Sequence, residues 1–172
     1  MAVPDDYADD IFHPCGQLRL ELLQEQTREA LERGLDYARL TRWDSVRSPH
    51  VFMGLLAAPD EGVANWGHRL GADMPRLLEQ FRELFFQECG DPDAHLVLHR
   101  EFLSDNVIRL LRDAFERAED HQRDAIAPMD ILISLFTTPN SIVAECFERI
   151  GVTAARLTEL AVMAEHHTAR AV

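Results

Sequence analysis

Apolar and small residues recur at intervals of three and four along much of this chain, which is the spacing of one face of an α-helix. Two segments, 27–38 and 107–118, keep this spacing for about three turns each. The positions on this face are Thr27, Ala30, Leu31, Gly34, Leu35 and Ala38 in the first segment, and Val107, Leu110, Leu111, Ala114, Phe115 and Ala118 in the second. The pattern predicts an amphipathic helix over each segment.

Two shorter apolar runs have the composition of buried helices. They read "SPHVFMGLLAAP" at residues 48–59 and "PMDILISLFTTP" at residues 128–139. The proline near the start of each run suits the first turn of a helix, where its missing N–H would have no partner. The proline at the end of each run, Pro59 or Pro139, predicts where the helix stops.

Each of these runs is followed by two further helical segments. The first is predicted over 61–70 and 141–150, because Gly71 and Gly151 follow it and suit the left-handed conformation at a helix C-cap. Trp66 falls inside this segment and is expected in the core. The N-cap residues predicted for the next segments, and for the 107–118 helix, are Asp73, Thr153 and Ser104.

The two sets of helices are copies of one another. Shifting the chain by 80 residues aligns identical residues without a gap over about 50 positions, which chance rarely produces. The identical pairs include Leu31 with Leu111, Ala38 with Ala118, Leu55 with Leu135, Pro59 with Pro139, Gly71 with Gly151 and Leu77 with Leu157. The sequence therefore predicts an all-α fold of eight helices, arranged as two pseudo-twofold repeats of four.

The duplication also predicts domain boundaries. A polar joint that contains Gly90 and Pro92, two residue types that interrupt helices, separates the copies. The predicted divisions are an acidic N-terminal extension at 1–17, a double domain at 18–163 (repeat one 18–86, joint 87–103, repeat two 104–163) and a C-terminal tail at 164–172.

Composition narrows the function classes. The formal net charge is −13, and all 17 residues counted as Lys or Arg are arginine. Phosphate recognition needs a basic surface, so we expect no nucleic-acid and no membrane partner. A chain without lysine has no Walker A loop and no Schiff-base lysine, and the GxSxG and HExxH motifs are missing too. We therefore expect no catalytic activity and no cofactor.

The cysteines and the N-terminal sequence indicate a cellular compartment. Cys15, Cys89 and Cys146 form no CxxC pair, and no apolar run approaches the length of a membrane-spanning helix. The start, "MAVPDDYADD", lacks the apolar centre of a secretion signal. We expect reduced thiols and a cytoplasmic location.

The phrase at residues 46–71, "VRSPHVFMGLLAAPDEGVANWGHRLG", resembles the N-terminal domain of Clp-type AAA+ unfoldases. The second copy, "IAPMDILISLFTTPNSIVAECFERIG", follows it more loosely, and the resemblance covers about residues 18–163. In that family the domain is a non-enzymatic double repeat of four helices that recruits substrates and adaptors to an ATPase ring. The resemblance implies a protein-binding module whose partners are protein or peptide substrates, an adaptor protein and a Clp-type ATPase. One branch of the family dismantles the contractile sheath of type VI secretion systems, and the sequence leaves both branches open.

The chain departs from the family at one informative point. Members that recognise phosphoarginine use a glutamate in a Thr-Glu-His phrase of each copy, and Pro49 and Met129 stand at those positions here. His50 matches the family histidine, whereas Asp130 replaces it in the second copy. These differences argue against phosphoarginine recognition.

The candidate binding residues lie in the loop after the first helix of each copy and at the end of the fourth helix. Trp43 stands in the first loop with Arg123 as its counterpart, and Trp and Arg are favoured at binding hot spots. The alternative is a Trp43 ring folded back over the neighbouring helix. Adjacent Phe85 and Phe86 cannot both face one core stripe, so one is expected in the crevice between repeats, with plain inter-repeat packing as the alternative. The predicted partner-binding set is Trp43, Arg47, Phe85, Phe86 and Arg123.

Two other functions stay open. His95 and His99 have the spacing of two metal ligands on one helix face, with Asp91, Asp93 or Glu101 as a third; a solvated polar joint is the alternative. The repeat core also suits a structural or regulatory oligomer. For the binding module we expect a monomer or a weak dimer.

Overall fold

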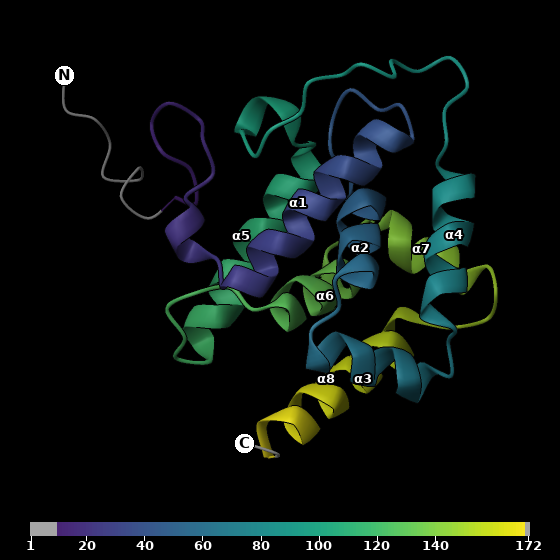
Figure 1. The fold of residues 1–172 in the computed structure, drawn as a ribbon. Helices are drawn as coiled ribbons and strands as arrows, with labels where there is room; N and C mark the ends of the chain where they lie inside the picture. Colours follow the sequence, from purple (N-terminus) through teal and green to yellow (C-terminus); the bar gives the residue numbers. More distant parts are fainter. Residues whose placement is uncertain (1–9, 171–172) are drawn as a thin grey trace.

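Helices make up the regular structure of this chain. The computed structural model describes residues 10–170, and within that range there are eight α-helices and no strand (Figure 1). The α-helices are α1 (Glu25–Leu40), α2 (Ser48–Ala57), α3 (Glu61–Leu70), α4 (Met74–Leu84), α5 (Asp105–Asp120), α6 (Pro128–Thr137), α7 (Ile142–Glu148) and α8 (Ala154–Arg170), with short 3-10 turns at Leu20–Leu22 and Arg100–Phe102. The predicted all-α fold of two four-helix repeats is confirmed.

The helix ends carry the predicted caps. Asp73, Ser104 and Thr153 each accept a hydrogen bond from the backbone N–H three residues further on, at 3.3, 3.3 and 3.1 Å. Gly71 and Gly151 have φ values of 75° and 88°, in the left-handed region that glycine adopts without strain. Local sequence chemistry therefore sets these helix boundaries.

Two short backbone bridges are related by the pseudo-twofold symmetry of the repeats. Leu23 pairs in parallel with Ile126, and Val46 pairs in parallel with Leu103. The 80-residue offset converts one bridge into the other with the repeats exchanged. The Ile126 N–H donates to the Leu22 carbonyl, and the Val46 N–H donates to the carbonyl of Phe102 at the end of the joint, both at 2.7 Å. Each repeat therefore holds the segment that leads into the partner repeat's second helix.

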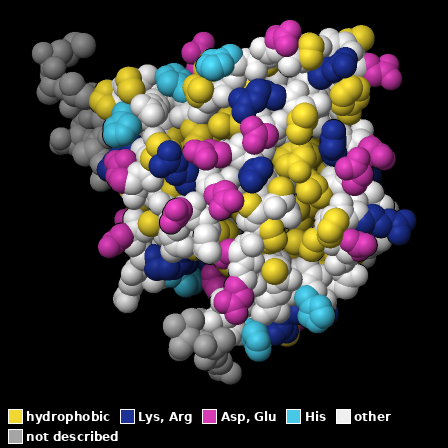
Figure 2. All heavy atoms as spheres, in the orientation of Figure 1, with side chains coloured by type: hydrophobic (Ala, Val, Ile, Leu, Met, Phe, Trp, Pro, Cys, Tyr) yellow, Lys and Arg dark blue, Asp and Glu magenta, His cyan; other side chains and the backbone are white. Residues whose placement is uncertain are grey.

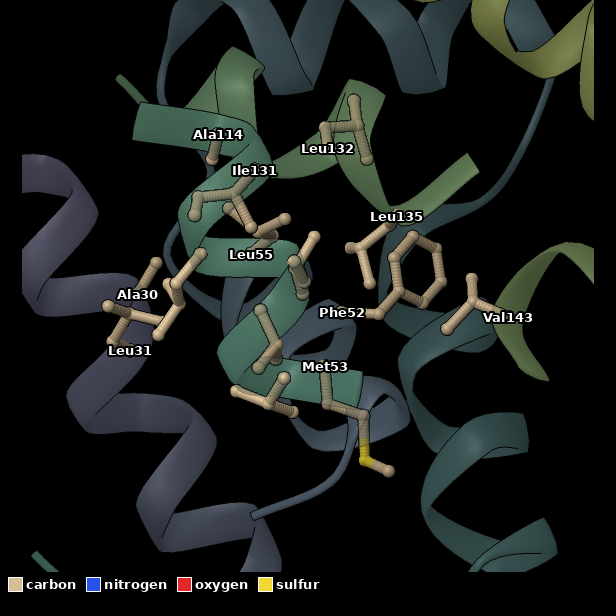
Figure 3. Close-up of a cluster of buried hydrophobic side chains, with 14 of the residues drawn as sticks. Ala30, Leu31, Phe52, Met53, Leu55, Ala114, Ile131, Leu132, Leu135 and Val143 are labelled. Atoms are coloured by element: carbon tan, nitrogen blue, oxygen red, sulfur yellow. The ribbon is translucent and has the colours of Figure 1, made fainter. Parts of the chain in front are cut away.

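The core lies between the repeats, with α2 and α6 at its centre. Nearly every side chain of these two helices is buried, and Figure 3 shows side chains such as Phe52 and Leu135 meeting there. Trp66 is fully buried, as predicted, and its Nε1–H donates to the Leu157 carbonyl at 3.2 Å. The aromatic rings packed around this centre are those of Phe52, Trp66, Phe81, Phe136 and Phe147.

Helices α1 and α2 cross at very short range. A Cβ atom added to Gly54 would lie 2.1 Å from the Ala30 carbonyl oxygen, well inside van der Waals contact. Ser134 occupies the equivalent position of α6. The close crossing therefore belongs to repeat one, and only glycine fits it.

The chain outside the helices is also built into the domain. Ile11 and Phe12, from the predicted extension, are each only 2% exposed. Asp10 forms ion pairs with Arg100 (2.8 Å) and Arg112 (3.2 Å), which tie this segment to the joint and to α5. Figure 1 shows the joint running along one edge of the molecule from α4 to α5.

At the other end, α8 continues through Arg170, so residues 164–170 of the predicted tail are helical. The domain boundaries themselves stay predictions. None of the helices described between residues 10 and 170 combines the length and apolarity needed to cross a membrane.

Candidate functional site

The loop after α1 places Arg42 in the left-handed conformation, with φ 65°. The Arg42 N–H donates to the Arg39 carbonyl and the Trp43 N–H donates to the Ala38 carbonyl, both at 2.9 Å. This is the Schellman arrangement of a helix C-terminus, which usually has glycine at the left-handed position. Repeat two forms the same turn with Gln122 (φ 59°). The turn reverses the chain and sets Trp43 beside the end of α4.

Trp43 folds back onto the protein, as the alternative interpretation of the sequence proposed. Its Nε1–H donates to the Phe85 carbonyl at 2.6 Å. Its ring meets the His50 ring edge-on, with centroids 5.5 Å apart. The side chain is half-buried, so one part of the ring supports the loop and the rest faces solvent.

Two arginines cover aromatic rings around Trp43. The Arg47 guanidinium carbon lies 5.3 Å from the Trp43 ring centroid, and that of Arg42 lies 5.0 Å from the Phe86 centroid. Phe86 is 43% exposed, whereas Phe85 stacks on Phe81 with centroids 5.9 Å apart. The two adjacent phenylalanines thus have different surroundings, and the part that either ring plays in binding stays a prediction.

Four of the five predicted binding residues therefore come together. We use the name repeat-one face for the set Arg42, Trp43, Arg47, Phe85 and Phe86. Figure 2 shows hydrophobic side chains gathered over the region of α2 and α4, with basic and acidic side chains around them. The face lies where the ends of α1 and α4 meet, because the Gln87 N–H donates to the Thr41 carbonyl at 3.0 Å.

His50 supports this face from below. The side chain is fully buried, its Nδ1 accepts the Arg47 backbone N–H at 2.9 Å, and its Nε2 lies 3.0 Å from the Thr41 hydroxyl. Burial, and next the charge of Arg47, lower the pKa of His50 from 6.5 to about 3. The ring is therefore a neutral structural group with both nitrogens engaged.

Arg123, the fifth predicted residue, is placed differently. It pairs with the fully buried Asp130 of its own repeat, donating from Nη2 at 2.7 Å and from Nη1 as well. Arg117 donates to Asp130 at 2.7 Å and to Glu165 at 2.8 Å. The hydrogen bond to Asp130 raises the pKa of Arg123. We name the set Arg117, Arg123, Asp130 and Glu165 the repeat-two cluster. Within residues 10–170 no hydrogen bond or ion pair joins Arg123 to the repeat-one face.

The two sites overlap in position, because two of the cluster residues, Arg123 and Glu165, are the counterparts of Trp43 and Phe85 in the repeat-one face. Each residue of the repeat-two cluster aligns with a repeat-one residue at the 80-residue offset. The aligned pairs are Tyr37 with Arg117, Trp43 with Arg123, His50 with Asp130 and Phe85 with Glu165. Uncharged and aromatic side chains in one repeat thus correspond to an internally neutralised ion cluster in the other. A comparison of charged and uncharged residues between the aligned repeats would have predicted this difference. From the sequence we noted only the pairs Trp43 with Arg123 and His50 with Asp130.

Solved structures of Clp N-terminal domains have a fold similar to that of this chain. The N-terminal domain of the Clp protease-associated chaperone ClpD from Arabidopsis thaliana matches with a TM-score of 0.65 at 21% identity, covering 86% of this chain and 97% of that one. The chain has the Clp N-domain fold. The N-terminal domain of the ClpV1 ATPase from the E. coli EAEC Sci1 T6SS matches with a TM-score of 0.61 at 16% identity (86% and 88% covered).

A further Clp N-domain, that of ClpV from Vibrio cholerae, matches with a TM-score of 0.62 at 16% identity over 83% of this chain and 84% of that one. No protein-family model and no curated protein sequence matches the chain. The likeness therefore rests on three-dimensional structure, and it confirms the resemblance seen in the sequence.

The joint does not form the helical histidine pair that the sequence left open as an alternative. Residues 95–99 are not helical, so His95 and His99 do not share a helix face, and that prediction is wrong. The His99 Nδ1 accepts the Glu101 N–H at 3.0 Å, and its Nε2 lies 2.9 Å from the Cys15 carbonyl oxygen. No group of three or more His, Cys, Asp or Glu side chains in the described part of the chain could hold a metal ion.

A cleft lies beside α1. This cleft of about 530 Å³ is lined mainly by leucine and valine side chains between the N-terminal segment, α1 and the joint. Its rim includes Glu32 and Val97, which is 41% exposed. Neither the cleft nor its residues were predicted, because they depend on how the joint crosses α1.

Proposed function

We propose that this chain is a non-catalytic protein-binding module, and that it recruits a substrate or an adaptor protein to a Clp-type AAA+ ATPase through the repeat-one face. The observation that carries the proposal is the exposed pair of arginine–aromatic contacts, Arg42 on Phe86 and Arg47 on Trp43. Trp and Arg supply much of the binding energy at protein interfaces, because their side chains combine apolar area with hydrogen-bond donors. The likeness to the ClpD and ClpV N-domains supports the same role.

The fixed position of the Trp43 ring also favours binding. The Trp43 ring is held by its bond to the Phe85 carbonyl and by the ring of His50. A side chain that is already ordered loses little conformational entropy when a partner covers it. The repeat-one face is therefore a preorganised surface.

A recruitment role does not require chemistry at this site. His50, the titratable group beneath the face, is buried with both ring nitrogens engaged, so it offers no proton-transfer group to solvent. The neighbours include a protease-associated chaperone and two ClpV proteins, so the proposal covers both branches of the family. The proposed partner is an ATPase of the cytoplasm, with the chain itself a monomer or a weak dimer.

The test is affinity capture from lysate of the native organism, followed by mass spectrometry, with the chain and two double variants as baits. The first variant, Arg42→Gln/Phe86→Ser, alters exposed atoms of the repeat-one face. The second, Glu32→Gln/Val97→Ser, alters the cleft beside α1 and is the matched control. Circular dichroism melting checks that all baits are folded.

We expect a Clp-type ATPase, an adaptor or a defined substrate in the wild-type and cleft-variant eluates, and its loss with the face variant. Contractile-sheath proteins in the same pattern would assign the secretion branch. Equal capture by the face variant, or loss with the cleft variant alone, would contradict the proposed face.

A further inference from the structure

We propose that the repeat-one face recognises a peptide segment that carries carboxylate side chains next to apolar ones. This inference rests on the proposed function and names the chemistry of its partner. It comes from the charge state and the remaining donors of Arg42 and Arg47, and from the apolar atoms around them.

The two arginines of the face are uncompensated. Within residues 10–170 neither Arg42 nor Arg47 forms an ion pair with a carboxylate, although the chain is rich in acidic residues. Asp44 and Glu88 are close in sequence, but the Arg42 Nη1 donates to the Glu88 carbonyl (3.0 Å) rather than to its carboxylate. The equivalent repeat-two cluster contains its own carboxylates. Repeat one thus leaves two positive charges that a partner can neutralise.

Both guanidinium groups retain donors for that partner. A guanidinium has five N–H groups in one plane. Arg42 uses one of them on the Glu88 carbonyl, and Arg47 uses Nε–H on the Ser45 hydroxyl at 2.9 Å. The two guanidinium carbons lie over the rings of Phe86 and Trp43, and a guanidinium group binds a carboxylate through pairs of hydrogen bonds from its remaining N–H groups. The arginines are therefore positioned to receive carboxylate oxygens.

Apolar surface adjoins these donors. Phe86 is 43% exposed, and the residues that end the two helices meeting here, Leu40 and Leu84, are 51% and 62% exposed. A segment in which acidic and apolar residues alternate can place carboxylates on the guanidinium edges and side chains on this apolar surface. Such a segment matches both features, whereas a purely acidic one matches only the first.

The overall charge favours a short acidic peptide over a nucleic acid. With a formal net charge of −13, the protein repels an extended array of phosphates over most of its surface. A short segment presents a few carboxylates at contact distance from the two arginines, and screening by salt weakens the long-range repulsion.

The experiment is fluorescence anisotropy with two labelled peptides of equal length, one alternating glutamate with leucine and phenylalanine, the other with glutamine in place of glutamate. The proteins are the wild type, Arg42→Gln/Arg47→Gln, and Arg109→Gln. Arg109 is an exposed α5 arginine that forms no ion pair within residues 10–170, so its variant shows how the loss of one positive charge away from the face affects binding. A single-stranded oligonucleotide is added as a competitor.

We expect the glutamate peptide to bind at least ~10-fold more tightly than the glutamine peptide, since hydrogen bonds to charged groups are roughly twice as strong as neutral ones. The Arg42→Gln/Arg47→Gln variant should lose that difference, and Arg109→Gln should keep it. Equal affinity of the wild type for the two peptides would overturn the acidic preference while leaving recruitment intact. Displacement of the peptide by the oligonucleotide would overturn the choice of a peptide partner, and absence of peptide binding combined with failed capture would remove the proposed function itself.

Discussion

His50 and Asp130 occupy the same position in the two repeats, and each accepts a hydrogen bond from the backbone N–H three residues earlier, at 2.9 and 2.8 Å. One is a neutral imidazole and the other a carboxylate bound by two arginines. The backbone requirement is therefore identical, but the electrical consequences differ. An aromatic residue, Trp43, lies over the histidine, and Arg123 lies against the aspartate.

The buried histidine predicts acid sensitivity. In the unfolded chain His50 binds a proton below pH 6.5, whereas in the folded protein it stays neutral down to about pH 3. Stability is thus fully present above pH 6.5 and is lost as the pH falls from 6.5 towards 3. This residue should lower the free energy of unfolding by about 2 kcal/mol between pH 8 and pH 5. Urea titrations at both pH values should show a flatter response for His50→Asn and an unchanged response for the exposed-site control His68→Asn.

The carboxylate of the repeat-two cluster should be strongly stabilising in its context. Replacing Asp130 by asparagine leaves Arg117 and Arg123 without their shared buried carboxylate, so we expect a loss of about 3 kcal/mol in the free energy of unfolding. Asp124→Asn changes an exposed residue of the loop that carries Arg123 and should cost less than ~0.5 kcal/mol. Chemical denaturation of both variants checks this, and a similar small effect for the two would show that the cluster is not coupled to folding.

The close crossing of α1 and α2 predicts intolerance at Gly54. A Cβ there meets the backbone oxygen of Ala30 at 2.1 Å, and backbone cannot rotate away, so Gly54→Ala should cost about 3 kcal/mol or more. Gly62→Ala is the matched control. Its Cβ would meet the flexible Met129 side chain at 2.8 Å, and we expect a much smaller loss. Thermal melting of both variants checks this. A much larger loss for Gly54→Ala than for Gly62→Ala is expected if the distance between α1 and α2 is fixed, and similar small losses would show that the two helices can move apart.

The left-handed Gln122 predicts a stabilising substitution. A non-glycine residue at φ 59° carries roughly 1–2 kcal/mol of strain, so Gln122→Gly should raise the free energy of unfolding by about 1 kcal/mol. Glu119→Gly, within the last turn of α5, should instead lower it by about 1 kcal/mol. Opposite signs in parallel melts would support the assignment, and a loss of stability in Gln122→Gly would contradict it.

Most of the fold could be predicted because its signals are local. The spacing of apolar residues marked the helices, Gly71 and Gly151 marked their ends, and the 80-residue offset revealed the duplication. The structure differs where a contact depends on distant chain segments. Ile11 and Phe12 are an example. They are core residues, but the acidic residues before them led us to predict an N-terminal extension there.

The candidate site could be predicted only in part. The residue types favoured at interfaces pointed to Trp43, and the adjacency of Phe85 and Phe86 pointed to an aromatic ring outside the core stripe. The bond from Trp43 to the Phe85 carbonyl spans 42 positions of sequence and has no local pattern. Arg123 was predicted as a binding residue because it is the counterpart of Trp43 in the loop of the second repeat. Arg123 forms an ion pair with the buried Asp130, a contact that the sequence pattern did not indicate.

The exchanged bridges, Leu23 with Ile126 and Val46 with Leu103, affect how the chain is made. A ribosome releases residues in order, so the first repeat emerges long before Ile126 is available to pair with Leu23. Until then its apolar surface around Trp66 has no second half to cover it, since the Trp66 indole is anchored on Leu157. Synthesis therefore includes an interval in which about half of the protein is exposed to aggregation and to chaperones.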